Sequence, residues 1–392
     1  MTDTRNNLRG PLAGLRIIEM AALGPVPFCG MMLADLGAEV IRIERAGAPP
    51  MGESFDPKFD LMGRGRRSIS LDLRNPHGVE IALKLIATAD GLMEGMRPGA
   101  MERLGLGPKE CQAVNEKLIY GRMTGWGQTG PLAQSAGHDI NYISLNGVLH
   151  SVGSRNGPPV IPINLVGDYG GGSMFLLVGM LAALLEVKTS GKGQVIDAAM
   201  LDGSSYLMST IHMFNGTGQW RPERGTNFLD GGAPFYSVYE TRDGKHMAVG
   251  AIEPKFYREF VDGLGLDIGA LPEPQNPANW DHLRTTFTDL FLTRSREDWS
   301  DVFSNRDACV TPVLSIEESF EHEHNRQRDS FPEIEGVARP DTAPRFSRTG
   351  ANAKQETPLT GQHGREILGE LGYSGQQIDN LIQQQIAVLP RG

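Results

Sequence analysis

The chain has 392 residues, of which 40% are hydrophobic and 21% are charged, and its formal net charge is -10. This composition is typical of a soluble globular protein of two or three domains. The negative charge argues against nucleic acid as the main partner, because phosphate binding needs a basic surface.

Targeting and redox signals in the sequence point to the cytoplasm. The N-terminal stretch MTDTRNNLRGPLAG is polar and has no apolar signal core. The most apolar stretch, Met174–Val187, is shorter than the ~20 residues of a membrane span, so we expect a buried helix there and no span. Three cysteines without a CxxC pair indicate reduced thiols rather than a disulfide framework or a zinc site.

Short apolar strands alternate with helices through the first third of the chain. We predict strands at 15–20, 39–45, 68–73, 91–94 and 118–124, and helices at 28–37 and 76–89. Repeated strand–helix–strand units predict a mostly parallel sheet that is covered by helices. Beyond them we predict helices at 139–149, 173–187 and 203–214, and a strand at 194–199.

The pattern changes after the polar, glycine-rich stretch 216–232. An antiparallel hairpin over 235–240 and 245–252 is predicted from its Asp-Gly turn, and helices follow at 254–263, 280–291 and 295–305. After Asp329 the chain is Pro-rich and extended, and it closes with helices at 364–371 and 374–386.

These elements predict an α/β protein with a large Rossmann-like domain and a smaller α+β domain. We expect residues 1–215 to form the N-terminal part of the large domain, 216–232 a linker, and 233–328 the small domain. Residues 329–392 are expected to return to the large domain and complete it with the C-terminal helices.

Two segments combine a reactive side chain, nearby glycines and a helix-like apolar run. They are Gly137–Tyr142, with His138, and Gly167–Ser173, with Asp168. Glycines allow close backbone approach to a ligand, and an imidazole and a carboxyl could move a proton between the two faces of one carbon. The alternatives are a polar helix-start residue for His138 and an N-cap for Asp168. A cap does not explain the three glycines that follow it.

Other motifs favour structural explanations. Gly125–Gly130 fits GxGxxG, but Pro131 and a polar stretch follow instead of a helix, which favours a glycine-rich loop over a nicotinamide site. His322 and His324 are spaced i, i+2 in a charged run, which favours a solvated surface over a metal site. Glu253, directly before Pro254, reads from the sequence alone as a cap or a first-turn acid.

Several arginines follow predicted parallel strands, at the edge where open α/β sheets bind ligands. They are Arg42, Arg45, Arg74, Arg97 and Arg103. The alternative for each is a salt-bridged surface position.

Taken together, the segments resemble the family III CoA-transferase superfamily over essentially the whole chain, and within it the racemases of 2-methylacyl-CoA thioesters. The resemblance rests on residues 14–20, 35–44, 96–99, 122–131, 137–142, 167–173, 231–236 and 307–312. The transferases typically have tyrosine where this chain has His138, and they use an aspartate that matches Asp168 as an acyl nucleophile. The racemases use the histidine and the aspartate as proton-transfer groups.

The resemblance implies further site residues and an interlocked homodimer. A glutamate that matches Glu253 lies near the histidine and acts within one chain or across the dimer. The residues implied to contact CoA are Arg45, Leu71, Asp72, Leu73, Arg74, Gly95, Met96, Arg97, Arg103, Gly137, Asn141 and Tyr142. The racemases usually carry lysine where this chain has Arg74, which keeps the charge and changes the contact geometry.

The expected reaction is racemisation at the α-carbon of an acyl-CoA, through an enolate. We expect His138 and Asp168 to exchange the roles of base and acid, and the backbone N–H of Asp139 to bind the enolate oxygen. CoA belongs to the substrate, and we expect no metal and no separate cofactor. The alternatives are a CoA-transferase with an Asp168 acyl anhydride and a catalytically silent CoA-binding protein. The sequence does not specify which acyl chain the substrate carries.

Overall fold

The computed structural model describes residues 9–47, 56–350 and 356–390, so most of the polar N-terminal stretch lies outside the described residues. The chain forms two compact units, the first from residues 1–146, 163–207 and 327–392, and the second from 147–162 and 208–326. This division differs from the predicted one. The whole expected linker, 216–232, lies in the second unit, where the Arg224 guanidinium donates hydrogen bonds to the carbonyls of Gly157 (2.9 Å) and His150 (3.0 Å).

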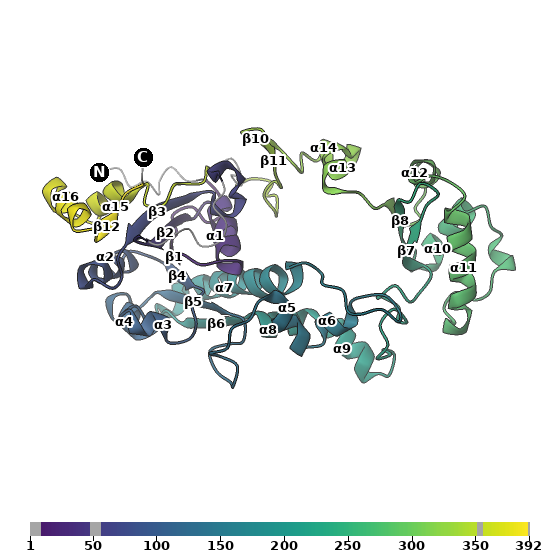
Figure 1. Cartoon of the computed structure of the whole chain (residues 1–392), viewed down its shortest axis with the longest axis horizontal. Helices are drawn as coiled ribbons and strands as arrows, with labels where there is room; N and C mark the ends of the chain where they lie inside the picture. The colour runs from purple at the N-terminus through teal and green to yellow at the C-terminus, as the bar shows by residue number, and fades with distance from the viewer. Residues whose placement is uncertain (1–8, 48–55, 351–355, 391–392) are drawn as a thin grey trace. The chain divides into compact units, whose positions relative to one another are not determined.

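The first unit is built on a seven-stranded sheet in the order β12-β3-β2-β1-β4-β5-β6 (Figure 1). The strands are β1 (Arg16–Met20), β2 (Glu39–Arg45), β3 (Arg66–Leu71), β4 (Gly91–Glu94), β5 (Ile119–Thr124), β6 (Val195–Ala199) and β12 (Ala387–Val388). All neighbours are parallel except β12, which is antiparallel to β3. The predicted α/β class is confirmed. The strand order reverses between β1 and β4, the point at which such sheets bind ligands.

Helices pack on both faces of this sheet because successive strand residues point to opposite sides. Ile17 of β1 lies in the core under α1 (Pro25–Asp35) and α7 (Met174–Ser190), whereas Ile18 lies in the core under α2 (Pro76–Ile86). Both side chains are fully buried, and each such burial stabilises the fold by about 1.5–3 kcal/mol.

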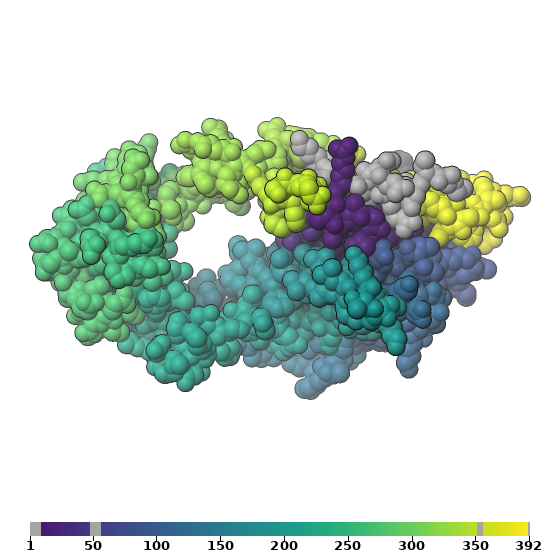
Figure 2. All heavy atoms as spheres, turned by 180° about the vertical axis from the view of Figure 1, so that it is seen from behind, coloured from purple at the N-terminus to yellow at the C-terminus, as the bar shows by residue number. Residues whose placement is uncertain are grey.

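Shorter elements complete the first unit. Its other helices are α3 (Ala100–Arg103), α4 (Pro108–Val114), α5 (Asp139–Leu145), α8 (Met200–Leu207), α15 (Gly364–Glu370) and α16 (Gly375–Gln383). Two 3-10 turns cover Pro57–Phe59 and Leu61–Gly63, and β10 (Glu333–Ile334) pairs with β11 (Val337–Ala338). The yellow C-terminal segment lies beside the blue N-terminal part of this unit (Figure 2). The antiparallel pairing of β12 with β3, with Ala387 opposite Leu71, accounts for this position.

Two predicted helices are each divided in the structure. The expected helix 139–149 is α5 followed by α6 (Val148–Ser151), because Gly147 adopts a positive φ of 87° that an α-helix does not accommodate. The expected helix 203–214 is α8 followed by α9 (Ser209–Gly216).

The helix predicted to start at Ser173 begins earlier, with a π-helix over Leu165–Ser173 that runs directly into α7. In the described part of the chain, Leu165–Ser190 is the one helical stretch that is long and apolar enough to cross a membrane by length and composition. Leu176, Leu177 and Met180 of this stretch are buried in the core of the first unit.

The second unit contains a three-stranded antiparallel sheet and five α-helices besides α6 and α9, among the described residues. The predicted hairpin is β7 (Tyr236–Glu240) and β8 (His246–Gly250), and β9 (Val310–Pro312) pairs with β8. The helices are α10 (Pro254–Gly263), α11 (Trp280–Phe291), α12 (Arg296–Phe303), α13 (Ile316–Glu321) and α14 (Glu323–Gln327), with 3-10 turns at Ile268–Ala270 and Pro277–Asn279. An aromatic core that includes Phe260 and Phe287 joins the three-stranded sheet to α10, α11 and α12.

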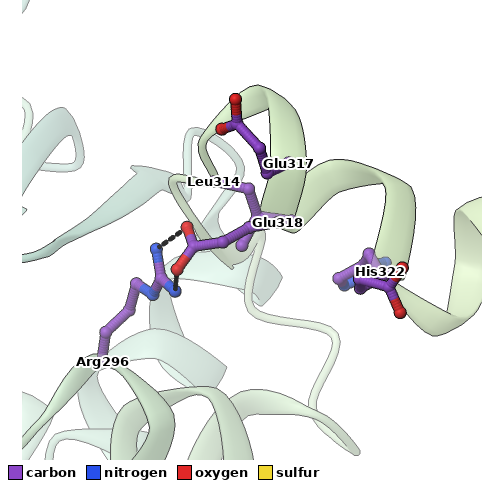
Figure 3. Close-up of a pocket in the computed structure, with 6 residues that line it drawn as sticks. Arg296, Leu314, Glu317, Glu318 and His322 are labelled. Carbon is purple, nitrogen blue, oxygen red and sulfur yellow. Dashed lines mark hydrogen bonds and ion pairs between the residues drawn. The ribbon is translucent and has the colours of Figure 1, made fainter. Parts of the chain in front are cut away.

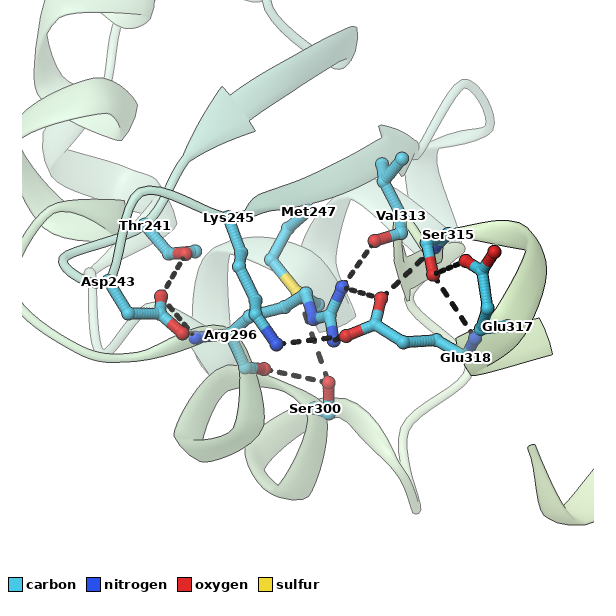
Figure 4. A network of polar contacts seen from close by, with 10 residues as sticks. All are labelled: Thr241, Asp243, Lys245, Met247, Arg296, Ser300, Val313, Ser315, Glu317 and Glu318. Atoms are coloured by element: carbon cyan, nitrogen blue, oxygen red, sulfur yellow. Dashed lines mark hydrogen bonds and ion pairs between the residues drawn. The ribbon is translucent and has the colours of Figure 1, made fainter. Parts of the chain in front are cut away.

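One arginine connects α12 to α13 in this unit. The Arg296 guanidinium donates to both carboxylate oxygens of Glu318, at 2.6 and 2.8 Å, and to the Val313 carbonyl at 2.6 Å (Figures 3 and 4). The Lys245 ammonium lies 2.9 Å from the same carboxylate. The Arg296 hydrogen bonds, followed by that of Lys245, hold the pKa of Glu318 well below its usual range.

We expect Arg296→Ala to accelerate amide hydrogen exchange in α13 by about tenfold, because a bidentate, charge-assisted contact is lost. Since the pKa of Glu318 is lowered by folding, this contact stabilises the fold above the usual glutamate pKa and is lost as the pH falls through the folded value. The difference between wild type and variant should therefore shrink in acid. Lys245→Ala, which leaves the bidentate pair intact, is the graded control, and an equal effect of both variants would contradict the assignment to Arg296.

Candidate active site

Asp168 lies in the first turn of the π-helix, at the edge of the sheet where the strand order reverses. Its carboxyl faces Gly24, the N-cap of α1: a Cβ atom built at Gly24 would lie 3.4 Å from Asp168 Oδ2. Gly24 has a positive φ of 68°. Gly95, which follows β4, packs against Val26 in the first turn of the same helix. The carboxyl therefore lies near the carboxyl ends of β1 and β4.

The start of α5 is joined directly to this position. Asp139, the first residue of α5, is only 7% exposed, and its Oδ2 accepts a hydrogen bond from the Asp168 backbone N–H at 2.7 Å. His138 is the N-cap of α5, and its N–H donates to Asn141 Oδ1 at 3.0 Å. The two reactive segments singled out in the sequence thus lie side by side, with the His138 side chain exposed and the Asp168 side chain half-buried.

Burial raises the pKa of the Asp168 carboxyl above its usual value. The hydrogen bond from Asn164 opposes this increase, the charge of Asp139 adds to it, and His138 also opposes it. A raised pKa makes the protonated form of a carboxyl more accessible near neutral pH, as a general acid requires.

Tyr142 of α5 lies in the same region. Its hydroxyl donates to the Gly137 carbonyl, and its ring contacts Trp126 edge-on with ring centroids 4.8 Å apart. Burial and then the charge of Asp168 raise the pKa of Tyr142, while Arg97 lowers it. Asp168, Tyr142 and Arg97 are therefore close enough to interact electrostatically.

The glycines after Asp168 have a different role from the one the sequence indicated. A Cβ at Gly171 would lie 2.5 Å from the Ser204 backbone nitrogen, and one at Gly172 would lie 2.9 Å from Met200 Cγ. Both glycines therefore permit close packing of the π-helix on α8, not the approach of a ligand. The alternative interpretation of Asp168 as an N-cap is also wrong, because Asn164 occupies that position.

The residues implied to contact CoA follow the carboxyl ends of the strands, except those at the start of α5. Arg45 ends β2, and Asp72, Leu73 and Arg74 follow β3; Gly95, Met96 and Arg97 follow β4, and Arg103 ends α3. Gly137, Asn141 and Tyr142 lie at the start of α5. Leu71 differs from the others, because the residue is fully buried in the core and its backbone is paired with β2 and β12 inside the sheet. Arg74 donates through Nε to Asp72 at 3.0 Å, and Arg45, Arg97 and Arg103 are exposed.

Glu253 lies in the second unit, at the N-cap position of α10. Its carboxylate makes no capping hydrogen bond, although the sequence favoured a cap or a first-turn acid. The side chain is exposed.

Asn164 was missed by the sequence analysis. Its side-chain amide donates to Asp168 Oδ2 at 3.1 Å and is the contact that most lowers the pKa of this carboxyl. The spacing of four residues before Asp168 could have indicated it, if a helical turn had been predicted there.

Asn164→Ala is expected to raise the pKa of Asp168 further, because the carboxylate loses a donor while its burial stays. A titration of the Asp168 side-chain carbon by NMR measures this shift. Asn146→Ala is the matched control, since the Asn146 amide donates to Leu201 and Ser204 and not to Asp168. An unchanged midpoint in Asn164→Ala would contradict the contact.

Three comparisons with known proteins agree with this architecture. The model of CoA-transferase family III matches residues 12–364. Alpha-methylacyl-CoA racemase of Mus musculus is 45% identical over 378 residues and that of Homo sapiens 42% over 380, each covering 96% of this chain and 97% of the relative. The crystal structure of a CAIB/BAIF family protein from Brucella suis matches with a TM-score of 0.77 and 27% identity, covering 93% of this chain and 100% of that chain.

Proposed function

Because the chain belongs to CoA-transferase family III, we propose that it is a racemase that interconverts (2R)- and (2S)-2-methylacyl-CoA thioesters. The named racemases that match at 45% and 42% identity over nearly the full length support this function. The structural observation that carries it is the hydrogen bond from the Asp168 N–H to Asp139, which brings the imidazole-bearing and carboxyl-bearing segments together.

The reaction begins with removal of the α-hydrogen next to the thioester carbonyl. The C–H bond breaks, its proton moves to His138 or Asp168, and its electron pair is delocalised onto the carbonyl oxygen as an enolate. The other group then delivers a proton to the opposite face of the carbon. Neutral His138 accepts a proton when protonated Asp168 donates one, and the roles are exchanged for the other enantiomer.

The enolate oxygen needs a hydrogen-bond donor, for which we propose the backbone N–H of Asp139. It is the first residue of α5, and the first four N–H groups of a helix have no partner within that helix. Removing a donor of this type typically costs ~10²–10³ in rate. Glu253, from the same chain or from a second copy, is proposed to stabilise protonated His138.

CoA is proposed to lie along the carboxyl ends of the strands. The exposed guanidinium groups of Arg45, Arg97 and Arg103 suit its phosphates. The thioester itself supplies the electron sink, so we propose no metal and no separate cofactor.

Proton NMR of a 2-methylacyl-CoA in D2O with the purified protein tests this function. We expect the α-proton signal to disappear from both enantiomers as deuterium is incorporated. Full retention of that signal from both enantiomers would refute the racemase and leave either a CoA-transferase or a CoA-binding protein without catalysis.

The alternative is a CoA-transferase in which the Asp168 carboxylate attacks the thioester and forms an acyl anhydride. The name of the family and the half-buried position of Asp168 support it. Hydroxylamine added after incubation with acyl-CoA separates the two functions, because only an acyl-enzyme yields a hydroxamate at Asp168.

We further propose a homodimer located in the cytoplasm. Apolar side chains on α7 support the dimer, since Val178 is 60% and Leu185 is 67% exposed in the single chain. Light scattering that gives the mass of one chain would contradict it.

A further inference from the structure

Both backbone polar groups of Asp168 are bonded to buried side chains. The N–H donates to Asp139 Oδ2 at 2.7 Å, and the carbonyl accepts from the Ser173 hydroxyl at 3.1 Å. Ser173 is fully buried, and its single hydroxyl proton is shared between this carbonyl and that of Pro25, which lies closer, at 2.8 Å, in the first turn of α1. A single hydroxyl therefore connects the turn that carries Asp168 with the turn that its carboxyl faces.

Packing around Ser173 keeps these two turns in contact. The rings of Phe28 on α1 and Tyr169 on the π-helix are stacked with centroids 4.6 Å apart. A Cβ at Gly172 would lie 3.2 Å from the Pro25 side chain. Ser173 thus provides a polar contact within the close packing of the π-helix against the first turn of α1.

The first turn of α1 is itself fixed to the sheet. Arg66 of β3 donates to the Pro27 carbonyl and pairs with Glu19 of β1 at 3.0 Å, and both charged side chains are fully buried. Because α1 is anchored in this way, the Ser173 hydroxyl bond can set the position of Asp168 relative to the sheet and not only relative to a mobile helix.

We propose that Ser173 is a positioning residue for Asp168, which it holds against the first turn of α1 through the Pro25 and Asp168 carbonyls. The inference rests on the proposed racemase function. A displacement of about 1 Å at a reacting group can cost ~10²-fold in rate. The effect should fall on the proton transfers that Asp168 makes and spare binding of CoA.

The pH dependence should change as well. The ionisable groups around Asp168 are His138, Asp139 and Tyr142 of the α5 segment, with Arg97 beyond Tyr142. The first turn of α1 carries no ionisable side chain, but its N-terminus favours a nearby carboxylate. If the Asp168 carboxyl moves away from this helix end, its ionised form loses that stabilisation and its pKa rises. The acidic limb of the pH–rate profile for exchange by Asp168 should therefore shift to higher pH.

Ser173→Ala tests the inference by deuterium exchange from each enantiomer separately. We expect a decrease of about 10–100-fold in kcat for the enantiomer that depends on Asp168 as base, a smaller change for the other, an unchanged KM and the shifted acidic limb. Ser204→Ala is the matched control: Ser204 is fully buried and packs against the π-helix at Gly171, but its hydroxyl donates within α8 to Met200 at 2.6 Å.

Equal losses for both enantiomers, or the same result from Ser173→Ala and Ser204→Ala, would overturn the positioning role. If circular dichroism shows that Ser173→Ala is unfolded, Ser173→Cys is measured against the same criteria, because a thiol fills the site and donates only weakly. A wild-type protein that exchanges neither enantiomer refutes the proposed function instead, so the two failures are distinguishable.

Discussion

Replacing His138 with alanine is expected to suppress α-hydrogen exchange from one enantiomer of 2-methylacyl-CoA by ~10²–10⁴-fold, the usual contribution of a positioned general base. The other enantiomer, whose proton is removed by Asp168, should lose much less of its exchange. The asymmetry follows from two separate bases that serve opposite faces of one carbon. Net racemisation should fall in both directions, because each direction uses both groups.

Exchange from each pure enantiomer in D2O, followed by mass spectrometry, measures this asymmetry. His77→Ala is a suitable control, since His77 is an exposed histidine in the first turn of α2. Equal and unaffected exchange rates from the two enantiomers in His138→Ala would exclude His138 as a base.

Asp168→Asn is expected to give the opposite asymmetry, with a loss of ~10²–10⁴-fold for the enantiomer that His138→Ala spares. The amide keeps an oxygen that can accept the Asn164 hydrogen bond, so the geometry of the site should be retained. In the transferase alternative the same variant should abolish hydroxamate formation while His138→Ala leaves it in place. The pair of variants therefore separates the two reactions.

The stability of Asp168→Asn, measured against pH, distinguishes loss of a catalytic group from loss of folding. The pKa of Asp168 is raised by folding, so between the ordinary carboxyl pKa and the raised value the folded chain binds more protons than the unfolded chain. The ionised carboxyl therefore lowers stability above that window and not below it. Asp168→Asn should be more stable than wild type near neutral pH, and this advantage should vanish in acid. A less stable variant at pH 7 would contradict the burial cost assigned to Asp168.

Glycine was the least informative signal in the sequence. The run Gly170–Gly172 indicated close approach of backbone to a ligand. In the structure, the space beside Gly171 is occupied by α8, and the space beside Gly172 by α8 and α1. Gly147 was passed over, although its positive φ divides a predicted helix in two. A glycine in a sequence is compatible with a close ligand, a closely packed helix or a positive φ, and the sequence alone does not distinguish these causes.

The sequence by itself determined the α/β class, the strands of the parallel sheet and the hairpin of the second unit. These follow from apolar periodicity and turn residues, which act over a few neighbouring positions. Only the tertiary structure decided that the order of strands reverses beside β1, and that Asp139 holds the Asp168 backbone. It also revealed Asn164 and Ser173 as partners of the Asp168 segment. Such contacts depend on how segments that are distant in the sequence pack together. The same packing buries the Asp168 carboxyl, and this burial raises its pKa.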